Sequence, residues 1–363
     1  MAKTVGKTVK TAPKKLRVAA IGTGSIFKGA HLQPWLDHSG VELAALCDIV
    51  ESKAKAIGKQ HGIARTFKNY RDVLKLKDVD IVDVCTPNKL HSEITVAALE
   101  AGKHVVCEKP DAINSVEAKR MADAAKASGK TLMVMRNNRF RPDSQFLKKY
   151  IEAGLMGEIY TGRCGWIRRR GIPGKGGWFT TKEMSGGGPL IDLGVHMMDL
   201  AIWLMGNPRP VAVSGATYCK FGNSDTQPGG WGEAVEGGTF DVEDLATGFI
   251  RFDNGATLQV EFSWASNIDK EINFVELRGE KAGACLHSDN PLKIFTEIEG
   301  TLCDIAPRVA AGVWSVHGLY LYHFVDVVLG RAKPMFRPQD GVHMIQILDA
   351  IYQSAKTGRE VVL

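Results

Sequence analysis

At 363 residues, the chain is longer than one ordinary domain, so we expect two domains. Hydrophobic residues make up 44% of it and charged residues 24%, with a mild net charge of +6, as in ordinary globular proteins, and no apolar run approaches the roughly 18 residues of a membrane-spanning helix. The seven cysteines are scattered and form no CxxC pair, which indicates neither a zinc site nor a disulfide framework and favours the cytoplasm.

Residues 1–15 carry five lysines and no apolar run. Such a segment is typical of a solvated, flexible arm, and it lacks the apolar stretch that an export signal would need. A basic tail for nucleic acid would need a basic helix or interleaved aromatic residues, and neither is present. We therefore expect no nucleic-acid partner and no membrane partner.

Short apolar runs alternate with helical stretches between residues 16 and 136. The runs predicted as strands are Leu16–Ile21, Val41–Cys47, Asp80–Cys85, His104–Cys107 and Thr131–Met135, and the clearest helices are Ser92–Ala101 and Ser115–Ala127. Strands that alternate with helices imply right-handed crossovers and a parallel sheet. This half is predicted to be an α/β domain with a doubly wound sheet.

Residues 137–363 have a different character, with longer strands. Helices are predicted at Pro142–Ala153, Pro189–Met205, Val316–Gly330 and Asp340–Thr357, and strands at Val211–Phe221, Leu245–Phe252, Ala256–Ser266 and Ile272–Arg278. Asp253-Asn254-Gly255 joins two of these strands and is a strong hairpin signal, because asparagine and glycine accept positive φ. We expect an α+β domain with an open, mainly antiparallel sheet, and a loop over residues 219–241 that could cover a site.

A glycine-rich turn follows the first strand. Glycine lets the main chain approach a pyrophosphate at a helix start, although Phe27 stands where the third glycine of GxGxxG usually lies. Asp48, which ends the second strand, can accept both ribose hydroxyls and repels a 2′-phosphate, so NAD is favoured over NADP, even though Lys53 lies nearby. An ordinary β–α turn and a helix cap are the plainer alternatives. The turn residues expected to bind the cofactor are Gly22, Thr23, Gly24, Ser25 and Ile26.

Two further motifs end the third and fourth strands, at the sheet edge where ligands bind in such folds. Thr86, Asn88 and His91 follow the third strand, and Glu108-Lys109-Pro110 closes the fourth. A lysine at a strand end usually points to solvent. Here Pro110 forces an extended approach and admits a cis peptide bond, which can hold Lys109 inward beside the cofactor. All five polar residues are candidates for cofactor contact.

Asp192 and His196 are spaced i, i+4 on one face of the helix predicted after Gly186-Gly187-Gly188, with Asp199 three residues further on. A histidine in an apolar helix is usually a satisfied core group, and Asp192 could cap the turn. A metal site is a third alternative, but no further ligand at a fixed spacing supports it. We favour an acid–base pair, because a glycine-rich approach leaves room for a ligand beside the helix.

Together these motifs resemble the glucose–fructose oxidoreductase/inositol dehydrogenase (Gfo/Idh/MocA) family. The resemblance rests on the turn at Gly22, Thr-Pro-Asn-x-x-His, Glu-Lys-Pro, Asn-Arg-Phe-x-Pro from Asn138, and Gly-Gly-Gly-x-x-x-Asp-x-x-x-His-x-x-Asp, in order over residues 16–363. It implies an N-terminal Rossmann domain at residues 16–136 and a C-terminal domain at 137–363 whose open sheet forms an oligomer interface. It also implies that Lys109, Asp192 and His196 are the catalytic set.

The leading hypothesis is an NAD-dependent sugar or polyol dehydrogenase. His196 would take the hydroxyl proton, Lys109 would hold the substrate oxygen, and Asp192 would orient His196 or the substrate. The alternatives on the same fold are a glycosidase that oxidises its sugar transiently with NAD, and a non-catalytic sugar-sensing regulator, against which the retained catalytic set argues.

Substrate contacts are predicted at Asn138, Arg170 and Trp178. Other arginine and tryptophan residues in segments that could reach the site are Arg163, Trp166, Arg168, Arg169 and Trp231. The aromatic residues Phe249, Phe252, Phe262 and Trp264 include both faces of the second sheet. An apolar second face tends to pack against another copy, so we expect a homodimer or homotetramer joined through this sheet.

Overall fold

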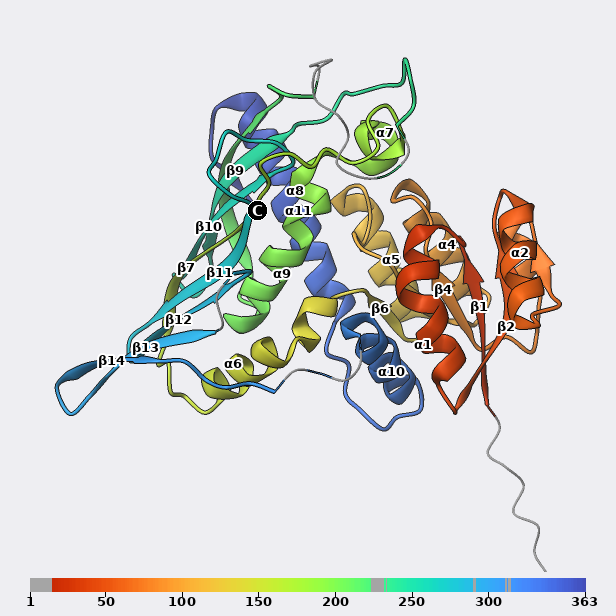
Figure 1. The fold of residues 1–363 in the computed structure, drawn as a ribbon, viewed down its shortest axis with the longest axis horizontal. Coiled ribbons are helices and arrows are strands. Elements are labelled where there is room, and N and C mark those ends of the chain that lie inside the picture. Colours follow the sequence, from red (N-terminus) through yellow and green to blue (C-terminus); the bar gives the residue numbers. More distant parts are fainter. Residues whose placement is uncertain (1–14, 223–231, 233, 290–291, 311, 313–314) are drawn as a thin grey trace, which may run out of the picture.

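The described residues of this computed structural model, 15–222, 232, 234–289, 292–310, 312 and 315–363, form two β-sheets flanked by helices (Figure 1). Residues 1–14 of the predicted basic arm therefore lie outside the described residues. Trp231 and residues 223–231 and 233 of the predicted loop at 219–241 also lie outside them. Among the described residues, no helix combines the length and apolar character needed to cross a bilayer.

The first sheet has six parallel strands in the order β3-β2-β1-β4-β5-β6. Its strands are β1 (Leu16–Ile21), β2 (Val41–Cys47), β3 (Thr66–Phe67), β4 (Ile81–Val84), β5 (His104–Cys107) and β6 (Leu132–Val134). The strand order reverses between β1 and β4, so a crevice is expected outside their carboxyl ends. The predicted doubly wound Rossmann sheet is confirmed.

Helices cover both faces of this sheet, as its strands require. Val18, Ala19 and Ala20 in β1 are wholly buried, which fits a strand that is covered on both sides. The helices of this half are η1 (Phe27–His31, a π-helix), α1 (Leu32–Asp37), α2 (Glu51–His61), α3 (Tyr70–Leu74), α4 (Lys89–Glu100) and α5 (Ser115–Ser128).

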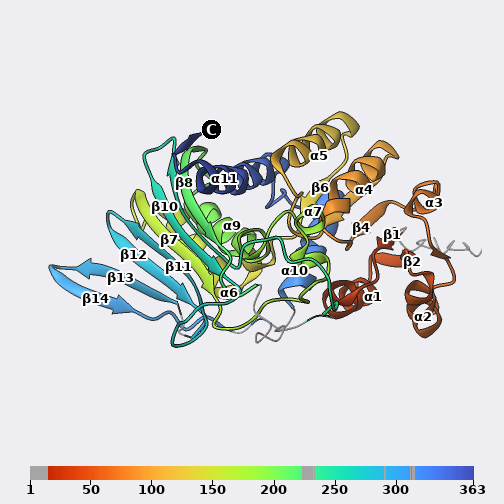
Figure 2. The same cartoon turned by 90° about the horizontal axis from the view of Figure 1, so that it is seen from above.

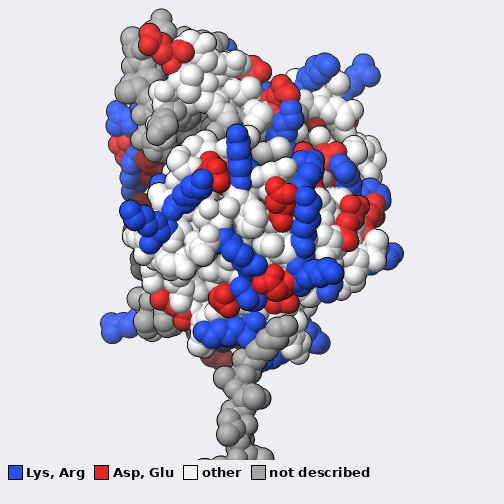
Figure 3. Space-filling view, turned by 90° about the vertical axis from the view of Figure 1, so that its right-hand side faces the viewer, with Lys and Arg blue, Asp and Glu red and all other residues white. Residues whose placement is uncertain are grey.

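One face of this half mixes both signs of charge. Figure 3 shows Lys and Arg interleaved with Asp and Glu over the face that ends the molecule on the first-sheet side. Neighbouring side chains pair within helices, as when Lys55 lies 3.1 Å from Glu51 in α2 and Lys119 lies 2.6 Å from Asp123 in α5. Interleaved charges of this kind do not add up to the one-sign field that attracts a polyanion.

The second sheet has nine strands in the order β14-β13-β12-β11-β7-β10-β9-β8-β15, with the β7–β10 pair parallel and the others antiparallel. The strands are β7 (Ile159–Ile167), β8 (Pro210–Tyr218), β9 (Leu245–Phe252), β10 (Thr257–Ser263), β11 (Ile272–Gly279), β12 (Ala282–His287), β13 (Lys293–Ile298), β14 (Thr301–Ile305) and β15 (Val361–Val362). The mainly antiparallel sheet is confirmed, as is the β9–β10 hairpin, in which Gly255 has a φ of +84°.

One face of the second sheet carries helices that also reach the first sheet. Figure 2 shows α9 and α11 on this face, and α11 contacts both β8 and α5. The helices of this half are η2 (Asn137–Phe140), α6 (Pro142–Glu152), η3 (Trp178–Thr180), α7 (Lys182–Ser185), α8 (Pro189–Asp192), α9 (Gly194–Leu204), α10 (Val316–Val328) and α11 (Pro338–Thr357).

The second half differs from the prediction in two respects. The helix predicted at Pro189–Met205 is broken at Leu193 into α8 and α9, and five strands, β7 and β12 to β15, were not predicted. Of the four aromatic residues, Phe252, Phe262 and Trp264 are at most 3% exposed. Phe249 is part-exposed, with the Arg251 guanidinium 5.1 Å from its ring.

Candidate active site

The glycine-rich turn brings the main chain against the end of β4. Gly22 has a φ of +93°, and a Cβ there would lie 2.4 Å from the Cys85 carbonyl oxygen, so only glycine fits. Phe27, in place of the third glycine, is fully buried and begins the π-helix, so it anchors this turn in the core. Thr86 Oγ1 is buried close by without a hydrogen-bond partner among the described residues. A close main-chain approach and an unpaired hydroxyl fit a nucleotide at this edge.

Asp48 is held at the mouth of the turn. Its Oδ2 accepts hydrogen bonds from Thr23 N at 2.8 Å and Thr23 Oγ1 at 3.0 Å, and its Oδ1 accepts one from Val50 N at 2.9 Å. Asp48 therefore joins the loop after β2 to the glycine-rich turn, with its carboxylate against Thr23. The predicted ribose contact stays a prediction.

Two of the predicted cofactor contacts are tied into the surrounding loops. Asn88 Nδ2 donates to the Ser185 carbonyl oxygen at 2.8 Å. The His91 ring is fully buried, and its nitrogens lie 2.7 Å from the Pro110 carbonyl oxygen and 2.8 Å from that of Thr86. His91 thus links the loops after β4 and β5, and a direct contact with cofactor by either residue stays a prediction.

Glu108 and Lys109 end β5 at the same sheet edge. The Lys109–Pro110 peptide bond is cis, as the sequence had suggested. Glu108 accepts hydrogen bonds from His31 Nε2 at 2.8 Å and from its neighbour's main-chain N at 3.1 Å. Burial would raise the pKa of Glu108, but the hydrogen bond and charge of His31 outweigh it and lower the pKa to about 2.

His31 stands at the centre of a buried cluster that sequence reasoning missed. Its Nδ1 lies 2.9 Å from Asp83 Oδ2, which also accepts a hydrogen bond from Trp35 Nε1 at 2.7 Å. Burial would lower the pKa of His31, but the charge of Asp83 more than offsets it and raises the pKa well above 6.5. The ring is therefore an imidazolium between two carboxylates, and it fixes Glu108 beside Lys109.

Lys109 meets Asp192 across the two halves of the chain. Lys109 Nζ lies 2.8 Å from Asp192 Oδ1 and 3.0 Å from the Asp192 carbonyl oxygen, and Trp264 Nε1 donates to Asp192 Oδ2 at 3.0 Å. Burial would raise the pKa of Asp192, but the charge and hydrogen bond of Lys109, followed by the charge of Arg168, bring it below its usual value. Asp192 is thus an anion whose two oxygens are taken by Lys109 and Trp264.

His196 projects from α9, one turn beyond Asp192. Burial, with the positive charge of Lys109, lowers the pKa of His196 to about 3, so the imidazole is neutral near pH 7. The Trp166 ring centroid lies 6.1 Å from that of His196. A neutral imidazole next to a lysine ammonium is an arrangement that can take a proton from a hydroxyl whose oxygen the ammonium holds.

The triple glycine before α8 was expected to leave room for a ligand, but it lies in close packing contact with Tyr352 and Glu243. A Cβ at Gly187 would lie 1.9 Å from Tyr352 Oη, and one at Gly188 would lie 2.0 Å from the Glu243 carbonyl oxygen. The glycines therefore allow close packing and do not leave room for a ligand. The Glu243 carboxylate accepts hydrogen bonds from the main-chain N of Gly188 at 3.0 Å and of Leu190 at 3.1 Å, which anchors the start of α8.

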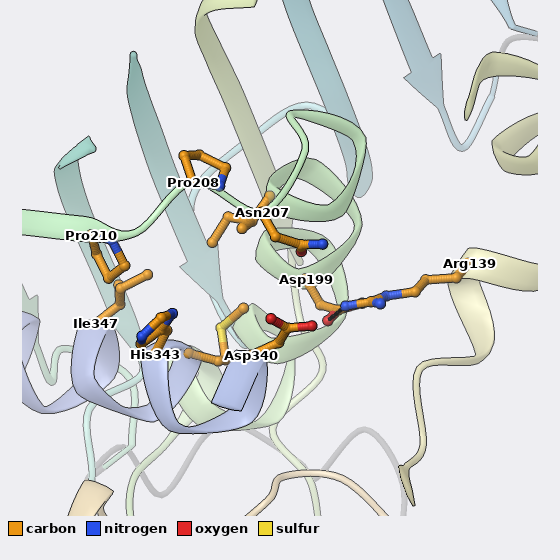
Figure 4. Close-up of a pocket in the computed structure, with 10 residues that line it drawn as sticks. Arg139, Asp199, Asn207, Pro208, Pro210, Asp340, His343 and Ile347 are labelled. Carbon is orange, nitrogen blue, oxygen red and sulfur yellow. Dashed lines mark hydrogen bonds and ion pairs between the residues drawn. The ribbon is translucent and has the colours of Figure 1, made fainter. Parts of the chain in front are cut away.

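Asp199, the last acid of the motif, is structural. It accepts hydrogen bonds from Arg136 Nε at 2.8 Å and from Arg139 Nη2 and Nε at 2.6 and 2.8 Å. Figure 4 shows Arg139 extended toward Asp199 at a small pocket that Asp340 and His343 of α11 also line. This buried network joins η2 to α9 and leaves Asp199 no part beside His196.

The predicted substrate residues are scattered. Asn138 Nδ2 lies 3.9 Å from Met197 Sδ, next to His196. Arg170 donates to the Ser266 carbonyl oxygen at 2.8 Å, and the Trp178 ring stacks on Phe179 at 3.8 Å.

Two residues at the end of β7 lie nearer the reacting groups. The Arg168 guanidinium is 4.9 Å from the Trp166 ring centroid, and Trp166 Nε1 donates to Glu271 Oε1 at 3.0 Å. Trp166 neighbours His196, and the charge of Arg168 acts on Asp192. Both residues were among those that the sequence indicated could reach the site, but because β7 was not predicted, the direction of their side chains could not be inferred.

Comparison with known proteins places these residues in context. Residues 16–136 match the family model described as "Oxidoreductase family, NAD-binding Rossmann fold", and residues 144–285 match the one described as "GFO/IDH/MocA C-terminal domain". D-glucoside 3-dehydrogenase of Escherichia coli (strain K12) is 38% identical over 351 residues, which cover 96% of this chain and 97% of the relative.

Two solved oxidoreductase structures are similar to this chain over nearly its whole length. Levoglucosan dehydrogenase in complex with NADH and levoglucosan aligns with a TM-score of 0.82 at 25% identity, covering 96% of this chain and 99% of that one. Aldose-aldose oxidoreductase from Caulobacter crescentus, complexed with glycerol, aligns with a TM-score of 0.79 at 26% identity, covering 96% and 100%.

Proposed function

The chain belongs to the Gfo/Idh/MocA family of oxidoreductases, and from that premise we propose that Lys109, Asp192 and His196 carry out its chemistry. It is an NAD-dependent oxidoreductase that acts on hydroxyl groups of sugars or polyols. The observation that supports the assignment of residues is the 2.8 Å contact between Lys109 Nζ and Asp192 Oδ1 beside a neutral His196.

The residues that would hold NAD follow the carboxyl edge of the first sheet. The turn at Gly22, Thr23 and Gly24 would face the pyrophosphate, and Asp48 would accept from the ribose. Bound there, NAD supplies the hydride acceptor. Lys109 would then stand at the far end of the same edge, where the reacting carbon must lie.

The three proposed catalytic residues have distinct parts. His196 accepts the proton of the substrate hydroxyl at a ring nitrogen, and returns it when the reaction runs in reverse. Lys109 donates to the same oxygen and stabilises its growing negative charge. Asp192 keeps Lys109 in place through the 2.8 Å contact between Lys109 Nζ and Asp192 Oδ1.

The proposed substrate is a pyranose or glycoside that reacts at a secondary ring hydroxyl. The relative named D-glucoside 3-dehydrogenase, aligned over 96% of this chain, supports this class. Trp166, beside His196, offers an aromatic surface for a sugar face, and Arg168 offers donors for hydroxyl oxygens.

Purified protein with NAD and a panel of glucosides, free sugars and polyols tests this. We expect NADH to accumulate in proportion to substrate. His196→Asn should lower kcat by about 10²- to 10⁴-fold while the Kd for NADH stays the same, as for loss of a positioned acid–base group. Normal turnover by a folded His196→Asn variant would contradict the assignment.

The same assay separates a net dehydrogenase from a glycosidase that oxidises its sugar only transiently. The glycosidase would release the aglycone with catalytic NAD and no net NADH, and it would let solvent deuterium enter beside the transient ketone. Aglycone release at constant NADH absorbance would overturn the dehydrogenase.

Assembly and location belong to the same proposal. We propose a cytoplasmic homodimer or homotetramer joined through the outer face of the second sheet. Part-exposed Phe249 and the Phe295 side chain, which is 40% exposed and points away from buried Ile294, support the interface, and the seven unpaired cysteines support a reducing compartment. A monomer in light scattering at micromolar concentration, or a chain found outside the cytoplasm on fractionation, would refute it.

A further inference from the structure

Trp264 is the one aromatic side chain described here that bonds to the proposed catalytic set. It follows β10 directly, is wholly buried, and its main-chain N donates to the Asp244 carbonyl oxygen at 2.9 Å. An indole offers one hydrogen-bond donor and no acceptor. That single donor, Nε1, forms a hydrogen bond to Asp192 Oδ2 at 3.0 Å.

The contact completes the surroundings of Asp192. Lys109, from the loop after β5, takes Oδ1 at 2.8 Å and the main-chain oxygen at 3.0 Å, so Oδ2 is left for Trp264. The carboxylate is thereby held from the first sheet on one side and from the second sheet on the other. It cannot rotate toward His196 without breaking one of these bonds.

We infer that Trp264 is a positioning residue for the reaction: its indole N–H holds Asp192 as the counter-ion of Lys109 and so leaves His196 free to accept the substrate proton. The inference rests on the proposed function, because it gives Trp264 a part only through Asp192. Nothing in a packing role alone would require an N–H at this place.

Loss of the Trp264 indole N–H would change the balance of charged and polar groups around the Asp192 carboxylate. Lys109, Arg168 and Trp264 face its carboxylate, with His196 on the next helical turn. A phenylalanine at position 264 would keep the apolar contact but leave Oδ2 buried without a donor. The carboxylate would then turn toward His196 or take up a proton, and in both cases Lys109 would lose its fixed partner.

Trp264→Phe tests this, with the Kd for NADH measured on the same sample to show that the variant is folded. We expect kcat to fall by about 10- to 100-fold, the scale of one hydrogen bond to a charged group, with the Kd for NADH unchanged. The acid limb of the kcat–pH profile should move to higher pH, because one of the donors that keep Asp192 ionised is gone.

Tyr320→Phe is the matched control. Tyr320 is also wholly buried and donates through its side chain, to the Val134 carbonyl oxygen, far along the chain from Asp192. Its loss should leave kcat and the pH profile as they are. A merely structural effect of deleting a buried aromatic donor would instead appear in both variants.

A double-mutant cycle with Asp192→Asn decides whether Trp264 acts through Asp192. In the Asn background, Trp264→Phe should change kcat by less than about threefold, since coupled residues are not additive. Should Trp264→Phe fail to bind NADH, benzothienylalanine at position 264, an isostere of tryptophan without the N–H, takes its place.

Wild-type kcat and pH profile in a folded variant, or full additivity in the cycle, would overturn the inference. Full activity of Asp192→Asn by itself would instead overturn the proposed function.

Discussion

Replacing Lys109 with methionine should destabilise the protein as well as inactivate it. The variant leaves the Asp192 side chain, 7% exposed, buried with the Trp264 N–H as its remaining side-chain partner. Breaking a buried pair by removing one partner costs about 3–5 kcal/mol. If all 363 residues unfold together, about 2.1 cal/mol/K for each gives an unfolding entropy of about 0.8 kcal/mol/K, so the melting temperature should fall by about 4–7 °C.

Differential scanning calorimetry at neutral pH measures the change in melting temperature. Two further variants show whether the unpaired buried carboxylate causes it. Lys109→Met with Asp192→Asn removes both charges and should recover most of the lost stability while remaining inactive. Lys119→Met breaks a pair in which both side chains are more than 60% exposed, so it should shift the melting temperature by about 1 °C or less. A Lys109→Met variant that melts with the wild type, or a double variant no more stable than the single one, would refute the reasoning.

Three further predictions concern the cofactor, the approach to α8 and pH. Asp48→Ala should raise kcat/KM with NADP relative to NAD, and an unmodified enzyme that already prefers NADP would contradict the proposed role. Gly188→Ala places a methyl group 2.0 Å from a main-chain oxygen and should cost about 1–3 kcal/mol in calorimetry, whereas Gly29→Ala, with open space around its Cβ, should cost nothing. The raised pKa of His31 beside Asp83 means that its stabilising contribution is complete below pH 6.5 and is lost as the pH rises above it; the melting temperature should therefore fall on the alkaline side in the wild type, and less so in His31→Gln.

Sequence patterns predicted the strands that are locally self-evident. Leu16–Ile21 and Val41–Cys47 have the predicted bounds because a strand buried on both faces is a nearly continuous apolar run, here interrupted only near its start by Arg17 and Glu42. The strand Ile159–Ile167 was not predicted, because Gly162 and Gly165 interrupt its alternation of apolar and polar side chains. A Cβ at Gly162 would lie 2.9 Å from Leu277 Cδ2, and one at Gly165 would lie 2.8 Å from the Glu261 carbonyl oxygen. The reason for these glycines lies in neighbouring strands, which no local pattern shows.

The candidate site divides in the same way. Lys109 could be singled out because it ends a strand at a ligand-binding edge, and Asp192 because of its spacing from His196. The partners that hold them could not be singled out: Trp264 lies 72 residues from Asp192, and His31 lies 77 residues from Glu108. Hydrogen bonds of that range depend on tertiary packing, and a single sequence offers no pattern for them.

The place of β7 in its sheet imposes an order on how the chain can fold. β7 is the first strand of the second sheet along the chain, yet it lies between β10 and β11, and contacts such as Thr161 to Thr257 and Arg163 to Glu276 span 96 and 113 residues. The first sheet can assemble from neighbouring segments, whereas β7 must wait until β10 and β11 have been synthesised. During that wait its two edges are open to pairing with other chains, and Arg163 together with the two glycines of β7 makes such pairing less favourable.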